Sequence, residues 1–360
     1  MKKYNFTYLL CFLLLVSLGV QAGNNDRIGQ AGGNELIINP WARQSGMHSL
    51  NQASARGLEA MRLNVGGLSF TNKTEVMFAS TRWLEGSDIT LSAFGFSQAV
   101  GDAGVLGVNI MAMSFGEIDR VTNSSPDVGP GGTFNPSYTN IGIAYSRSFS
   151  ESIHGGILVR LINHSIADVS ASGVAFDTGI QYVTGDNQQI KFGISLRNVG
   201  SPMKFEGDGL DLNATITNSV EEGTFSQRAE RYELPSLLHI GGAYDFYFGE
   251  SIRLTAAANF TSNTFRKDFL GGGIEVAFKE MFMLRAGYKY EEGILDPAIG
   301  NSALNGMSAG LTVEVPLNSK KVAAAGEDED ISESTFSIDY SYRHTNFYNG
   351  VHTLGIRFNL

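Results

Sequence analysis

Cysteine is nearly absent from this chain: its 360 residues contain only Cys11, which lies in an apolar stretch near the start. No comparable apolar run follows, and charged residues make up only 17% of the sequence. If that stretch is removed from the mature protein, no cysteine remains, and the mature chain has no disulfide and no thiol chemistry. Because no further apolar run is long enough for a transmembrane helix, the sequence excludes a helical membrane protein. A formal net charge of −10 argues against nucleic acid as a partner, because no basic stripe could neutralise phosphates.

The first 22 residues have the pattern of a secretory signal peptide. Met1-Lys2-Lys3 is basic, Leu9 to Val20 is apolar, and Val20-Gln21-Ala22 has the small-x-small pattern of a signal-peptidase site. The apolar run is too short for a spanning helix, and no cysteine lies at the cut, as it would in a lipoprotein. We therefore expect residues 1–22 to be removed after Ala22 on export.

Apolar and polar positions alternate in many parts of the chain. In the last eleven residues, Gly350 to Leu360, alternate positions are mostly apolar and the others are small or polar. Period-two alternation indicates a strand with two different surroundings. The pattern recurs in segments of about ten residues, the length that a tilted strand needs to cross a bilayer. Such segments include 190–197, 252–260, 282–290 and 336–343.

Turn signals between these segments predict about fourteen strands. They are placed near 74–84, 88–98, 103–116, 137–149, 152–164, 173–184, 189–200, 235–248, 251–262, 268–279, 280–291, 303–316, 333–345 and 349–360. An even number is what a bacterial outer-membrane barrel requires. The predicted fold is all-β: a transmembrane antiparallel β-barrel over residues 74–360, with its carboxyl terminus in the periplasm.

Loop lengths give an independent indication of this fold. If the carboxyl terminus is periplasmic, the periplasmic connections are short, whereas the extracellular set includes the long segments 117–136, 201–234 and 292–302. This asymmetry is typical of outer-membrane barrels. A secreted sandwich, the competing interpretation, gives no reason for it. Residues 317–332 are the exception, a long periplasmic connection whose acidic run at 327–330 we interpret as solvated.

Residues 23–73 precede the first strand and lack strand character. Apolar residues recur there at roughly helical spacing until Gly66-Gly67: Met47, Leu50, Ala53, Leu58 and Met61. The direction of the strands places the start of this segment in the periplasm. We expect residues 23–73 to fold back into the barrel as a partly helical plug.

Three motifs between residues 36 and 84 carry a family resemblance. They are Asn39-Pro40-Trp41-Ala42-Arg43-Gln44-Ser45-Gly46-Met47, Leu63-Asn64-Val65-Gly66-Gly67-Leu68 and Trp83-Leu84. On these motifs the chain resembles the PorV/PorQ family of outer-membrane proteins, from the type IX secretion systems of Bacteroidetes. His48 stands where the family has the second glycine of Gly-Met-Gly, and Val65 where it has the proline of Asn-Pro-Ala. Both departures fit a divergent paralogue.

The resemblance implies a fold, a location and partners. The family looks like fatty-acid channels of the FadL type, with fourteen strands and an N-terminal segment that plugs the lumen. Its members are thought to receive cargo proteins by a C-terminal signal domain and to carry them from the translocon to an attachment machine. The implied location is the cell outer membrane, and the implied partners are its lipid and type IX translocon or cargo proteins.

The residues show no catalytic constellation. The histidines at 48, 154, 164, 239, 344 and 352 lack metal-ligand spacing. Gly271-Gly272-Gly273 lacks the lysine and helix of a phosphate loop. Glycine in a barrel strand more often permits curvature or the close approach of a plug. We therefore predict a protein that is no enzyme and that has no cofactor and no metal site.

Charges on the inward face bear on what the lumen could carry. The expected luminal cations are Lys191, Arg197, Arg253, Arg285, Arg343 and Arg357. Several acids share that face, and so many charges need water or one another, because an unpaired buried charge is costly. The sequence therefore favours a hydrated or plugged lumen over an oily one. A FadL-like channel for small hydrophobic molecules is the alternative.

The extracellular loops then become the expected site of function. Apolar side chains in exposed loops are candidates for a protein interface. The candidates here are Phe134, Met203, Phe205, Leu210, Leu212, Phe225 and Tyr232. We expect them to bind secreted cargo or a translocon or attachment subunit. The competing expectation is that these loops fold over the barrel mouth and pack on themselves. A third hypothesis is a structural surface β protein.

Overall fold

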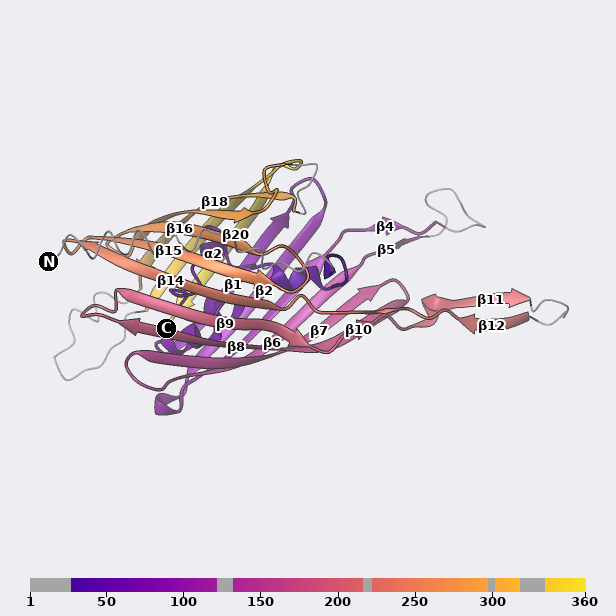
Figure 1. Ribbon diagram of the computed structural model, residues 1–360, viewed down its shortest axis with the longest axis horizontal. Coiled ribbons are helices and arrows are strands. Elements are labelled where there is room, and N and C mark those ends of the chain that lie inside the picture. Colours follow the sequence, from indigo (N-terminus) through magenta and orange to yellow (C-terminus); the bar gives the residue numbers. More distant parts are fainter. Residues whose placement is uncertain (1–26, 122–131, 216–221, 297–301, 318–333) are drawn as a thin grey trace.

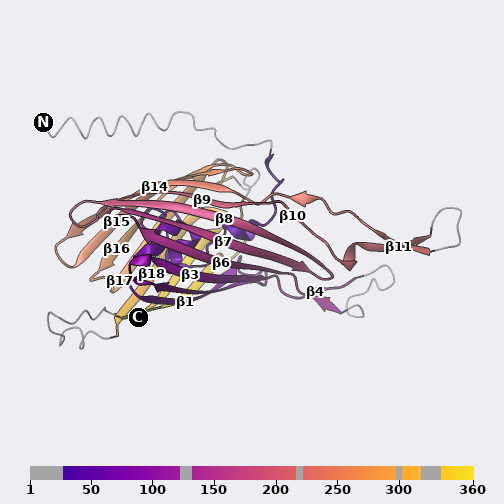
Figure 2. The ribbon, with the colours of Figure 1, turned by 90° about the horizontal axis from the view of Figure 1, so that it is seen from below.

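The computed structural model describes residues 27–121, 132–215, 222–296, 302–317 and 334–360. Fourteen antiparallel strands form a closed barrel (Figures 1 and 2). Strands that follow one another in the chain are neighbours in the wall. The wall closes where β1 (Thr74–Trp83) pairs with β20 (Val351–Asn359). The predicted fold class and strand number are confirmed.

All the predicted strands are present, and their ends lie within four residues of the prediction. The largest difference is at β8, which begins at Val169. The strands between β1 and β20 are β2 (Ile89–Ala99), β3 (Val105–Ser114), β6 (Ser137–Ser148), β7 (Ile153–Ile166), β8 (Val169–Thr184), β9 (Ile190–Gly200), β14 (Leu237–Phe248), β15 (Ile252–Asn263), β16 (Phe269–Phe278), β17 (Phe282–Glu291), β18 (Leu304–Pro316) and β19 (Thr335–Thr345).

The alternation in the sequence becomes the two surfaces of the wall. In β3, Val105, Met111 and Met113 are buried inside, whereas Leu106 and Ile110 are exposed on the outside. Large apolar side chains are exposed in this way on every strand of the barrel, and they form the surface that an outer-membrane barrel presents to lipid. The fold and this apolar surface together support an outer-membrane location.

Thr74 and Leu360 lie together at one end of the barrel, which we call the periplasmic end. The opposite, extracellular end carries three small two-stranded sheets that the sequence did not predict. They are β4 (Ile118–Asp119) with β5 (Thr133–Phe134), β10 (Met203–Lys204) with β13 (Arg231–Tyr232), and β11 (Asp211–Thr215) with β12 (Glu222–Ser226). The β11–β12 hairpin projects well beyond the wall (Figure 1). Nearly all of the predicted periplasmic loop 317–332 lies outside the described residues.

Residues 34–70 run through the inside of the barrel, and we call them the luminal segment. They form η2 (Asn34–Ile37), α2 (Ala42–Ser45), η3 (Leu58–Arg62) and η4 (Val65–Phe70). Element α2 packs against β18, β19 and β20, and η4 packs against β6, β7 and β8. Two further short turns, η5 (Gly101–Ala103) and η6 (Asp208–Leu210), lie outside the lumen, in loops. No helix of the described ranges is long and apolar enough to cross a membrane.

The luminal segment differs from the prediction in direction and in helicity. Ala31, just before it, bridges to Glu233 of an extracellular loop, so the described chain starts at the extracellular end and descends to Thr74. The expected periplasmic start is wrong for these residues. The expected helical spacing also yields only one four-residue α-helix. His48 and Gly57 adopt positive φ values of 52° and 69°, which interrupt a regular helix.

Candidate functional site in the lumen

Glycines of the inner wall allow the luminal segment to touch the strands. A Cβ added at Gly156 would lie 2.7 Å from Val65 Cγ1, and one at Gly271 would lie 2.6 Å from Leu50 Cδ1. One at Gly287 would lie 2.6 Å from the carbonyl carbon of Met47. Real Cβ atoms do not approach other atoms so closely, so these positions accept no other residue unless the segment shifts. Close approach of the segment inside the barrel, one of the two roles expected for strand glycines, therefore applies at these positions.

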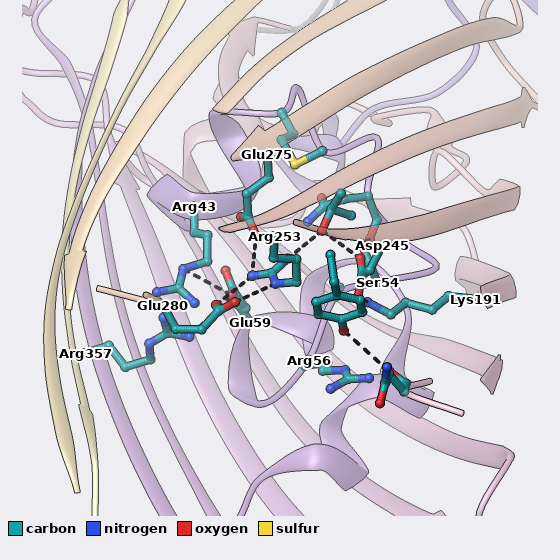
Figure 3. Close-up of a pocket in the computed structure, with 16 residues that line it drawn as sticks. Arg43, Ser54, Arg56, Glu59, Lys191, Asp245, Arg253, Glu275, Glu280 and Arg357 are labelled. Atoms are coloured by element: carbon teal, nitrogen blue, oxygen red, sulfur yellow. Dashed lines mark hydrogen bonds and ion pairs between the residues drawn. The ribbon is translucent and has the colours of Figure 1, made fainter. Parts of the chain in front are cut away.

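A charged cavity of about 380 Å³ lies below the luminal segment, on the periplasmic side (Figure 3). Arg43 of α2 reaches Glu314 at 2.9 Å and Asp339 at 3.5 Å. Arg357 of β20 lies 3.5 Å from both Glu59 and Glu314. Strand and segment charges thus share one network, which ties residues far apart in the chain to one another.

The other side of the same cavity is also built from ion pairs. Lys191 of β9 donates to Asp245 of β14. Arg253 of β15 contacts Glu275 at 2.9 Å and Glu280 at 2.7 Å, and Arg285 pairs with Glu275 as well. Most of the charges in Figure 3 therefore pair with one another across neighbouring strands, which reduces the cost of burying them.

All six cations proposed from the sequence lie on the inner face. Five of them form ion pairs: Lys191, Arg253, Arg285 and Arg357 as above, and Arg197 with Asp177 at 3.9 Å. Arg343 differs from the other five, because no described carboxylate forms an ion pair with it. Within the described ranges, no cluster of three histidine, cysteine, aspartate or glutamate residues could hold a metal ion.

A second cavity of about 530 Å³, the extracellular chamber, lies above the luminal segment. Ile38, Leu63 and Met113 line it together with aromatic side chains from the extracellular ends of four strands. These aromatic residues are Trp83, Phe115, Tyr138 and Phe269. The chamber is therefore largely apolar, in contrast to the charged periplasmic cavity. Its size falls in the usual range for a small-molecule site.

The two cavities meet at consecutive residues of the luminal segment. Met47 lines the periplasmic cavity, and His48 and Ser49 line the extracellular chamber. The backbone at His48 is left-handed, with a φ of 52°, a conformation that glycine adopts without steric cost. His48 lies outside the membrane-spanning strands and is buried. Burial, followed by the charges of Lys289 and Arg343, lowers its pKa well below the ordinary value, so the imidazole is neutral.

The loop residues proposed as a partner surface divide into two groups. Met203 is buried against Leu36, with Phe205 and Tyr232 packed beside them. The Tyr232 hydroxyl lies 2.9 Å from His164, whose other ring nitrogen contacts Glu35. These loop residues close over the barrel mouth. For this part of the loop, the structure agrees with the competing expectation that the loops fold over the mouth and pack on themselves. Phe134 and Leu210 are half-buried.

The other group stays free of the barrel. Leu212 and Phe225 face each other across the β11–β12 hairpin and are 57% and 48% exposed. They form an apolar pair on an otherwise polar projection. The structure thus separates residues that the sequence analysis had placed on one surface.

Sequence reasoning missed the extracellular chamber. The chamber combines single side chains from distant strands with two turns of the luminal segment, and no local motif marks such a set. One signal was present: Trp83, Tyr138 and Phe269 each stand within two residues of the extracellular end of a strand, on the inward register. Aromatic residues gathered at one end of a barrel predict either an interfacial girdle or, if they face inward, a lined mouth.

Comparisons with known proteins support the fold. No protein-family model and no curated protein matches the chain. The Ralstonia pickettii toluene transporter TbuX shares 10% identity at a TM-score of 0.53, over 89% of this chain and 97% of that one. The Pseudomonas putida toluene transporter TodX shares 12% at 0.52, over the same fractions. A Pseudomonas aeruginosa FadL homologue shares 9% at 0.50, over 88% and 98%. At such identities the likeness concerns the fold alone.

Proposed function

We propose that this outer-membrane barrel is a channel that takes up small, largely apolar molecules from the cell surface. The observation that carries the proposal is the extracellular chamber, an apolar, aromatic-lined cavity of about 530 Å³ inside the wall. A concave apolar site of this size with a few polar groups is the usual form of a small-molecule site. This is the transport alternative of the sequence analysis.

The luminal charges do not oppose this function as the sequence alone suggested. Most of them surround the periplasmic cavity, where they pair with one another. The solved barrels of the same fold include toluene transporters, and a role of that kind is part of our proposal. The luminal segment separates the chamber from the periplasmic cavity, so passage requires residues near Met47 and His48 to move.

Uptake of radiolabelled toluene by cells that produce the protein tests this function. We expect uptake at least about threefold above that of cells without it, because a channel bypasses the polar outer leaflet. Met113→Trp puts a larger side chain into the chamber and should lower uptake, since it takes up part of the volume. Ile110→Trp, on the same strand but facing outward, is the matched control and should leave uptake unchanged.

Two results would contradict the channel. One is wild-type uptake equal to that of cells without the protein. The other is equal uptake by the Met113→Trp and Ile110→Trp variants. Retained heat-modifiability on gel electrophoresis shows that a variant barrel is folded. Leu237→Trp, at another position of the chamber lining, repeats the test if Met113→Trp does not fold.

A second candidate function rests on the exposed pair Leu212 and Phe225. Large apolar side chains on a projecting hairpin favour a protein interface. The resemblance to the PorV/PorQ family suggests cargo or translocon proteins of type IX secretion as partners. Deletion of residues 211–226 removes the hairpin and leaves Met203 and Tyr232 at the barrel mouth. Co-purification of partner proteins should be lost on this deletion, and unchanged co-purification would rule out the hairpin as their binding site.

A further inference from the structure

Arg343 is a buried cation that faces the extracellular chamber without an ionic partner. It is 5% exposed and lines the chamber. Its Nε and Nη2 atoms are buried and have no hydrogen-bond partner. Its contact is with an aromatic ring: the guanidinium carbon lies 5.0 Å from the centroid of Trp83. An arginine stacked on a ring keeps its planar edge free for a carboxylate.

The surroundings of Arg343 do not supply that carboxylate. The chamber lining contains four cations, namely Arg197, Arg266, Lys289 and Arg343. Its one carboxylate, Glu35, is directed to His164 at 2.9 Å. Lys289 pairs with Glu291 at 3.1 Å and also lies 4.9 Å from the ring centroid of Phe269. Asp177 and Glu291 thus offset the charges of Arg197 and Lys289, whereas no described carboxylate forms an ion pair with the buried Arg343.

The rest of the lining determines what kind of anion fits. Around Arg343 lie flat aromatic faces, with Phe115 and Tyr138 packed edge to face at a centroid distance of 4.9 Å. Aromatic side chains favour a planar ring through offset stacking and edge contacts. The volume holds a single ring with a short substituent with room to spare.

We propose that Arg343 and Trp83 form an anion site that makes the extracellular chamber selective for aromatic carboxylates over uncharged aromatic molecules. The carboxylate would accept hydrogen bonds from the free edge of Arg343 while the ring packs among the aromatic side chains. This inference rests on the proposed function, since it specifies which small molecules the chamber takes. It assigns a charged ligand, whereas the toluene transporters of the same fold are named for an uncharged one.

Calorimetry with matched ligands on the detergent-solubilised protein tests the site. 4-Ethylbenzoate and 4-ethylbenzamide have nearly the same shape and differ in charge. We expect wild type to bind the benzoate about tenfold or more tightly than the benzamide, because hydrogen bonds to charged groups are the stronger ones. Arg343→Gln should abolish this preference, and Arg343→Lys should keep part of it. Arg82→Gln, on the exposed outer rim, is the control and should bind as wild type does.

Octanoate tests the aromatic part of the assignment. It should bind at least about threefold more weakly than 4-ethylbenzoate, since it lacks a ring for the aromatic lining. Equal binding of octanoate would overturn the preference for an aromatic body. Equal binding of benzoate and benzamide to wild type, or an unchanged preference in Arg343→Gln, would overturn the anion site and leave the channel intact. If neither binds, the anion site is wrong, and the toluene uptake assay decides the channel separately.

Discussion

Asn64 of the luminal segment occupies the space in which a side chain at Gly179 would begin. A Cβ built on Gly179 would lie 2.2 Å from Asn64 Oδ1. The same oxygen accepts from the Gly66 amide, and Asn64 Nδ2 donates to Gln52 and to the Ile180 carbonyl at 3.0 Å each. The side chain thus joins two turns of the segment to β8. The missing Cβ at Gly179 is what allows this contact.

Gly179→Ala should therefore release the luminal segment. The methyl group cannot fit without breaking the hydrogen bonds of Asn64, and we expect a loss of about 2 kcal/mol in the free energy of unfolding. Trypsin cleavage after the fully buried Arg62 should become faster, which reports on the segment itself. Gly242→Ala is the matched control, because its nearest atoms lie 3.6 Å away and none belongs to the segment. Equal cleavage of both variants would contradict this docking.

Arg43 holds three acids together, since it also approaches Glu59 at 4.0 Å besides Glu314 and Asp339. Arg43→Met leaves these acids with fewer partners in a buried network. We expect a loss of about 3 kcal/mol, as for one partner of a buried ion pair, measured by urea unfolding in detergent. Arg82→Met removes a pair with Glu85 at the exposed rim and should cost about 0.5 kcal/mol or less. Similar losses in the two variants would show that the luminal network contributes little.

Substitutions of Met203 and Leu212 test whether the extracellular loop has one part packed at the barrel mouth and one part free of the barrel. Met203→Ser places a hydroxyl in a buried apolar cluster, so we expect a loss of about 3 kcal/mol in the free energy of unfolding. Leu212→Ser changes an exposed residue and should shift stability by about 0.5 kcal/mol or less. The midpoint of thermal unfolding in detergent measures both. A large loss in Leu212→Ser would mean that the hairpin packs on the barrel.

The buried His48 predicts a pH dependence of stability. Its pKa is lowered on folding, so below about pH 6.5 the unfolded chain takes up a proton that the folded chain does not. This group's contribution to stability is therefore present above pH 6.5 and falls on acidification, by about 2 kcal/mol at pH 5. His48→Asn suits the left-handed backbone and cannot titrate. The difference in unfolding temperature between pH 7 and pH 5 should shrink in His48→Asn and stay unchanged in the exposed His344→Asn.

The barrel could be predicted from sequence because the apolar and polar alternation of each strand is contained in about ten consecutive residues. Leu106 and Ile110 face lipid and Met111 and Met113 face the lumen, so the two environments alternate along β3. The length of the loops then fixes the direction of the chain. Boundaries are less well determined: β8 begins at Val169, four residues before its predicted start, because it continues beyond the lipid-facing surface to the extracellular end.

The interior could not be predicted in the same way, because its contacts join distant residues. Met47, Leu50 and Leu58 have helical spacing in sequence, yet each contacts a different strand glycine, Gly287, Gly271 and Gly95. Likewise Arg343 has the same inward register as Arg285. Arg285 has a carboxylate, Glu275, on the neighbouring strand, whereas Arg343 has Ser308 opposite it. The identity of the residues on the neighbouring strands decides this difference.

The pairing of β1 with β20 sets the order in which the molecule can be assembled. Thr74 and Leu360 exchange backbone hydrogen bonds of 3.2 and 2.8 Å, so the two ends of the barrel sequence form its last joint. The luminal segment already contacts strands on both sides of that joint. The inner-wall glycines leave it no clearance for threading into a finished tube. The wall must therefore be wrapped around its own amino-terminal residues, and arrival of the final strand marks the moment at which they are enclosed.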